Sequence, residues 1–137
     1  MYRFVALILV LPFLTACPDD SVVPVISEIA PGILADARID VSTGRMPSGE
    51  VKVRGEVVIE NNSSQSFLYS NSRLWLKVGQ EISRRAYVES AASHAVDSGF
   101  VEIPAGQNLK LSVYWVFSKR IHISFDDRTV SIGFAAP

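Results

Sequence analysis

The stretch Val51-Lys52-Val53-Arg54-Gly55-Glu56-Val57-Val58-Ile59-Glu60 carries the clearest structural pattern in the chain. Apolar residues at alternate positions are separated by charged ones, which is the period of a β-strand with one buried face. Gly55 interrupts the apolar row, and a glycine there more often marks a bulge or a close inter-sheet approach than a ligand site. The stretch therefore predicts a core strand.

The same alternation recurs along most of the chain. The apolar positions of the other predicted strands are Ala35, Ala37, Ile39 and Val41; Leu74, Leu76 and Val78; Leu109, Leu111, Val113, Trp115 and Phe117; Ile121, Ile123 and Phe125; and Val130, Ile132 and Phe134. Shorter strands are expected at 67–69 and at 82–89, the second returning from a turn at Gly79-Gln80 as a hairpin. Seven or eight short strands without a helical period predict an all-β fold, an antiparallel β-sandwich. A small β-barrel is the alternative, because alternation does not reveal whether a sheet closes on itself.

The N-terminus has the three parts of a secretory signal. Arg3 supplies positive charge, residues 4–14 are apolar, and small residues precede Cys17. The apolar run has 11 residues and contains Pro12, whereas a helix that crosses the hydrocarbon core needs about 20. The run therefore predicts a processed leader and not a transmembrane span.

Leu14-Thr15-Ala16-Cys17 resembles the lipobox of bacterial lipoproteins at all four positions. The resemblance implies that the Cys17 thiol receives diacylglycerol, that a signal peptidase cuts before Cys17, and that the N-terminal lipid holds the protein on a membrane of the cell envelope. The mature chain is then expected to face the periplasm, with the choice between inner and outer membrane left open. The alternative is an ordinary cleaved signal that leaves Cys17 as a free thiol or removes it.

Three segments follow from this interpretation. Residues 1–16 form the signal peptide, residues 17–32 form a lipid-anchored tether, and residues 33–137 form the β-sandwich domain. Two prolines and two acids between 18 and 24 discourage both helix and sheet, which favours the tether.

Composition limits the possible functions. Cys17 is the only cysteine, so an intramolecular disulfide cannot form. From Cys17 onward the chain carries 12 basic and 14 acidic residues, a net charge of −2. This balance gives no electrostatic case for binding nucleic acid or an anionic membrane surface.

A second resemblance concerns the domain. The stretches Val57-Val58-Ile59-Glu60-Asn61-Asn62, Leu74-Trp75-Leu76-Lys77-Val78 and Ile103-Pro104-Ala105-Gly106-Gln107 resemble the immunoglobulin-like domains of bacterial surface lipoproteins. The resemblance covers residues 51–125 and implies an immunoglobulin-like sandwich that acts in binding or scaffolding. The chain departs from antibody-type domains in having no cysteine pair and in placing Trp115 late in the sequence.

The chain offers little catalytic chemistry. A metal site needs three or four ligands at workable spacings, which His94, His122 and scattered acids do not supply. No Gly-x-Ser-x-Gly motif singles out a nucleophile. The pairs Asp19-Asp20 and Asp126-Asp127 fit a tether and a tight turn, and Arg84-Arg85 fits a solvated strand face. We therefore predict no enzymatic activity, no cofactor and no metal.

Aromatic side chains are the better candidates for a binding surface. Trp75 and Tyr114 fall on the outward phase of their strands and predict a partner surface, unless a neighbouring loop at 90–99 covers them. The favoured hypothesis is a lipid-anchored, non-enzymatic module that presents a sandwich face or an unpaired strand edge to another envelope protein. The alternative is a small-ligand binder or hydrolase with its site in the 90–99 loop, around His94 or His122.

Overall fold

The computed structural model describes residues 22–89, 99–118 and 129–135. Several predictions concern residues outside these ranges. They are the signal peptide and Cys17, the strand with Ile121, Ile123 and Phe125, the two histidines, the acidic pairs, and the 90–99 loop up to residue 98.

The described part of the chain is built from strands, which confirms the all-β prediction. In chain order these are β1 (Val22–Ala30), β2 (Ile33–Arg45), β3 (Val51–Asn61), β4 (Phe67–Tyr69), β5 (Leu74–Val78), β6 (Glu81–Ser83), β7 (Tyr87–Val88), β8 (Val101–Ile103), β9 (Asn108–Phe117) and β10 (Val130–Phe134). A single 3₁₀ turn, η2 (Asn71–Arg73), separates β4 from β5.

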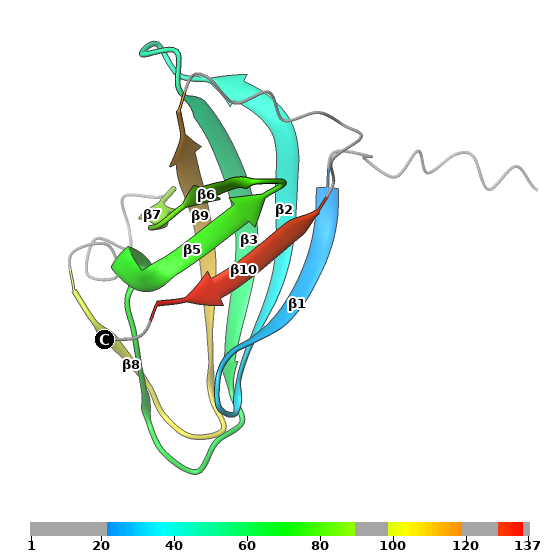
Figure 1. The fold of residues 1–137 in the computed structure, drawn as a ribbon. Helices are drawn as coiled ribbons and strands as arrows, with labels where there is room; N and C mark the ends of the chain where they lie inside the picture. The colour runs from blue at the N-terminus through cyan, green and yellow to red at the C-terminus, as the bar shows by residue number, and fades with distance from the viewer. Residues whose placement is uncertain (1–21, 90–98, 119–128, 136–137) are drawn as a thin grey trace, which may run out of the picture.

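The strands form an antiparallel sandwich. One layer is a five-stranded sheet in the order β1-β2-β3-β9-β7, and the strands β10-β5-β6 cross in front of it in Figure 1. A two-stranded sheet of β4 and β8 lies beside the second layer, where Phe67 and Tyr69 pack against Phe134 of β10 with ring centroids 5.3 and 5.8 Å apart. The large sheet ends at β1 and β7 and does not close into a barrel.

The strand order limits the likeness to antibody domains to their architecture. The consecutive strands β1, β2 and β3 lie side by side in one sheet. Antibody constant-type domains order their sheets ABED and CFG, so that the third strand of the chain lies in the other sheet from the first two.

The predicted core rows of β3 and β9 are confirmed. Val53 and Trp115 are fully buried and lie opposite each other in the antiparallel register. The indole Nε1 of Trp115 donates a hydrogen bond to the carbonyl oxygen of Leu74, at 3.0 Å, which links the two layers through the core. A buried indole N–H needs such a partner, so this contact fixes the orientation of the ring.

Gly55 marks a close approach of side chains from the two neighbouring strands of its own sheet, whereas the prediction was a bulge or an approach between sheets. A Cβ atom added at this position would lie 2.9 Å from Cζ3 of Trp115 and 2.8 Å from Cδ1 of Ile39. The glycine therefore leaves room for the largest side chain of the core.

The structure corrects the boundary of the domain. Residues 22–30, assigned above to the tether, form β1, which pairs with β2 along its length and buries Val25. In the sequence Pro24 favours the tether, but an edge strand tolerates proline because one side of its backbone has no ladder to complete. The domain therefore includes residues 22–30, which the prediction assigned to the tether.

The predicted strand at 82–89 is two strands in different sheets. β6 pairs with β5 and confirms the hairpin, whereas β7 pairs with β9 in the five-stranded sheet. The chain changes layers at Arg84-Arg85, between these two strands.

Candidate functional site

Trp75 and Tyr114 do not share a surface. Trp75 lies on β5 of the three-stranded sheet and Tyr114 on β9 of the five-stranded sheet, and each alternates with buried neighbours. Because the buried neighbours fill the space between the layers, the two aromatic side chains lie on opposite outer faces. A single partner surface containing both is therefore excluded.

Tyr114 is covered by its own sheet. Tyr87 of β7 stacks on it with the ring centroids 5.3 Å apart, and Nζ of Lys52 lies 4.1 Å from its ring centroid. Arg85 in turn lies over the ring of Tyr87, at 4.3 Å, so this arginine of the basic doublet belongs to the stack. Among the described residues, β7 and its neighbours cover Tyr114. The 90–99 loop, the other predicted cover, lies outside the described residues up to position 98.

Trp75 rests flat against β10. It pairs in register with Gly133, and a Cβ atom added to this glycine would overlap Cζ2 of Trp75. Gly133 is buried beneath the indole and Trp75 is left half-buried. Both predicted partner residues are thus largely occupied by contacts within the fold.

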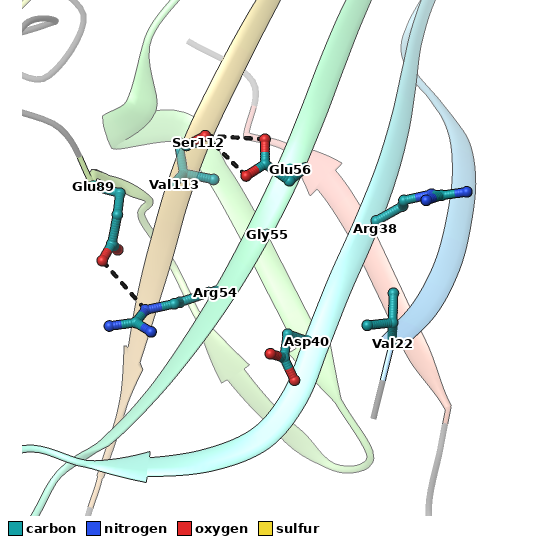
Figure 2. Close-up of a pocket in the computed structure, with 9 residues that line it drawn as sticks. All are labelled: Val22, Arg38, Asp40, Arg54, Gly55, Glu56, Glu89, Ser112 and Val113. Carbon is teal, nitrogen blue, oxygen red and sulfur yellow. Dashed lines mark hydrogen bonds and ion pairs between the residues drawn. The ribbon is translucent and has the colours of Figure 1, made fainter. Parts of the chain in front are cut away.

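A polar hollow lies on the outer face of the five-stranded sheet, with a volume of about 330 Å³. Figure 2 shows the side chains that line it, which are Val22, Arg38, Asp40, Arg54, Glu56, Glu89, Ser112 and Val113 around the backbone of Gly55. Glu89 accepts from Lys52 Nζ at 3.1 Å and from Arg54 Nε at 3.2 Å. The Ser112 hydroxyl donates to the carboxylate of Glu56 at 2.9 and 3.0 Å.

Among the described residues, Arg38 is the cation of this hollow that forms no ion pair. It stands opposite Glu56 in the strand register, yet its guanidinium extends away from Glu56, toward β1 in Figure 2. An exposed guanidinium can bind a small polar molecule that carries an anionic group. The residues come from strands far apart in the sequence, and only the register of β2, β3 and β9 brings them together.

An apolar groove lies where the second layer is divided between the β10-β5-β6 sheet and the β4-β8 pair. It has a volume of about 650 Å³ and is lined by Ile29, Ala30, Pro31, Ser66, Phe67, Leu68, Arg73, Phe100, Phe134 and Ala135. Leu68 and Phe100 are large apolar side chains with 58% and 56% of their surface exposed. The guanidinium of Arg73 lies 5.2 Å from the ring centroid of Phe100 and brings a positive charge to the groove.

Sequence reasoning missed this groove. The available signal was the apolar run Phe67-Leu68-Tyr69, because a strand can bury only alternate side chains on one face. Phe67 and Tyr69 take the positions that face Phe134, which leaves Leu68 exposed on β4.

Within the described ranges, no three His, Cys, Asp or Glu side chains gather where they could hold a metal ion. The same residues include no helix with the length and apolar character to span a bilayer. Comparison of the chain with protein-family models, with curated proteins and with solved structures found no match. The two surface hollows and the N-terminal motif are therefore the features of the chain that bear on its function.

Proposed function

We propose that this chain is a lipid-anchored protein of the bacterial cell envelope whose β-sandwich is a non-catalytic docking module. The observation that carries the proposal is the short distance along the chain between Cys17 and β1. Four residues separate Cys17 from Val22, the first residue of the sandwich.

This spacing holds the domain close to its anchor. Four intervening residues reach at most about 17 Å when extended. β1 then runs through the sandwich, and its nine residues span about 30 Å. Val22 is therefore the membrane-proximal end of β1, and the groove residues Ile29, Ala30 and Pro31 lie at its other end.

Confinement to a surface suits a docking module. Two or three acyl chains anchor a protein durably, since each buried methylene contributes about 0.8 kcal/mol. Tethering raises the effective concentration of the module for partners near the same membrane, so that a small apolar contact is sufficient for binding. The exposed Leu68 and Phe100 supply such a contact.

The anchor is tested by labelling cells with radioactive palmitate. The wild-type protein is expected to carry the label and Cys17→Ala to lack it. Ser21→Ala, which leaves the lipobox intact, is the matched control and should label as the wild type does. Label retained by the Cys17→Ala variant would refute attachment at this residue.

The docking role is tested separately by photo-crosslinking in living cells. A photoreactive amino acid at position 68 is expected to trap one reproducible envelope protein. The same group at Ile82, which is 45% exposed on β6, is the control and should trap none. Identical adducts from positions 68 and 82 contradict a localised docking surface.

A second candidate function is the binding of a small polar ligand in the polar hollow. The observation that favours it is the exposed guanidinium of Arg38, which points toward β1 and forms no ion pair among the described residues. A rise in melting temperature with a small anionic sugar or amino acid, lost in Arg38→Gln, supports this candidate over the docking module.

A further inference from the structure

We propose that the apolar groove binds an extended segment of a partner protein that carries an apolar side chain next to a carboxylate. This inference rests on the proposed docking function and specifies the chemistry of the partner. Three features of the groove carry it: a strand edge, exposed apolar side chains and a single cation.

The strand edge belongs to β4. Among the described residues, Phe67 and Leu68 pair only with β8, and none of the β8 residues lines the groove. The other edge of β4 therefore lies on the groove side, between β8 and the ends of β1 and β10. An extended peptide can add to such an edge through main-chain hydrogen bonds, with alternate side chains entering neighbouring pockets.

The apolar side chains define what enters. Phe67 and Phe134 contact each other at the wall of the groove, while Leu68 and Phe100 expose more than half of their surface. Burying an aliphatic or aromatic side chain against them stabilises a complex by about 1.5–3 kcal/mol. The groove therefore favours a large apolar residue.

The cation defines the flanking charge. Arg73 is the one charged residue among those that line the groove, and its described contact is with the ring of Phe100. No described carboxylate forms an ion pair with it. A guanidinium held over an aromatic ring keeps donors available for a carboxylate, so an Asp, Glu or chain terminus beside the apolar residue completes the site.

The position of the groove favours a protein segment over a bilayer lipid. It lies at the end of β1 away from Val22, about 25 Å along the strand, and so faces away from the proposed anchor. An acyl chain with an acidic headgroup has related chemistry but offers no backbone for the edge of β4. It is the competing occupant that the experiment must separate.

The test is a peptide selection against the full-length protein in lipid nanodiscs. The protein is biotinylated on lysine, because no lysine lines the groove, and empty nanodiscs remove peptides that bind lipid. Random peptides of about 12 residues are long enough to span the groove as a strand. We expect enriched sequences in which an aromatic or aliphatic residue stands next to Asp or Glu.

Variants then locate the binding. Phe100→Ser and Arg73→Gln are each expected to weaken an enriched peptide about tenfold, which corresponds to about 1.4 kcal/mol. Ile82→Ser and Lys77→Gln, at exposed positions on β6 and β5, are the matched controls and should leave the affinity unchanged. Replacing the peptide carboxylate by an amide should cost the same factor on the wild type and nothing further on Arg73→Gln.

Three results overturn the inference: no enrichment, equal binding to Phe100→Ser, or no coupling between Arg73 and the peptide carboxylate. Laurate below its micellar concentration is the lipid probe, and saturable laurate binding without peptide binding assigns the groove to an amphiphile. The anchor is read independently, because a protein without lipid does not enter nanodiscs. If the protein carries no lipid and does not enter nanodiscs, the same peptide selection is run on the protein in buffer. Failure of the anchor and failure of the groove are therefore distinguished.

Discussion

The carboxamide of Asn61 donates a hydrogen bond to the carbonyl oxygen of Ile103, at 2.8 Å, and so ties the end of β3 to β8. The same nitrogen donates to the carbonyl oxygen of Gln65 at 2.7 Å, and the amide oxygen accepts from the backbone N–H and hydroxyl of Ser63. The Asn61 backbone pairs with Gly106 and Gln107 in the β8–β9 turn. One fully buried residue thus organises the turn end of the sandwich, and Ser66, which follows the same turn, lines the apolar groove.

Replacing Asn61 by alanine should therefore destabilise the fold. Ser63, Gln65 and Ile103 lose their partner in a buried position, and we expect a loss of about 2–3 kcal/mol in the free energy of unfolding. Urea denaturation measures it. The exposed neighbour Asn62 is the control, and Asn62→Ala should change stability by less than about 0.5 kcal/mol. Equal effects of the two substitutions contradict this role of Asn61.

Gly55→Ala tests the close approach in the core. The added methyl group overlaps Ile39 and Trp115, and we expect a cost of about 1–3 kcal/mol. Ile39→Val removes the Cδ1 atom that lies 2.8 Å from the new Cβ, so the double variant should lose less stability than the sum of the two single variants. Strict additivity in chemical denaturation counts against the overlap.

Gly133→Ala tests the packing of the Trp75 indole against Gly133. The new methyl group occupies the position of the indole, so Trp75 should swing outward at a cost of about 1–3 kcal/mol. Tryptophan fluorescence should shift to longer wavelength, since the exposed indole enters water while Trp115 stays buried. In a Trp75→Leu background the same glycine substitution should leave the emission unchanged. An unshifted spectrum with the native Trp75 argues against the packing described here.

The inward rows of β3 and β9 could be predicted because long strands with one buried face show strict alternation. β1 could not, because its proline obscured a strand that tolerates proline only by lying at a sheet edge. The separation of Trp75 from Tyr114 depends on which sheet each strand joins. Alternation predicts which side chains share one face of a strand, but not the sheet to which the strand belongs. The groove combines residues as distant as Ile29 and Phe134, which no local pattern connects.

The stack of Tyr87 on Tyr114 gives a fourth prediction. A double-mutant cycle with leucine at both positions should give a coupling energy of about 0.5–1.5 kcal/mol, the usual range for aromatic pairs. The cycle between Tyr87 and Trp75, which lie on opposite outer faces, should give a coupling near zero. Coupling of equal size in both cycles rules out a specific stack.

The central claim is that a lipid on Cys17 holds this sandwich at a membrane. Intact-mass spectrometry of the protein extracted from cell membranes tests it most directly. The account predicts a chain that begins at Cys17, with the mass of residues 17–137 increased by a diacylglyceryl group, alone or with one further acyl chain. A mass equal to the bare polypeptide, whether it begins at Cys17 or at another residue, contradicts the claim.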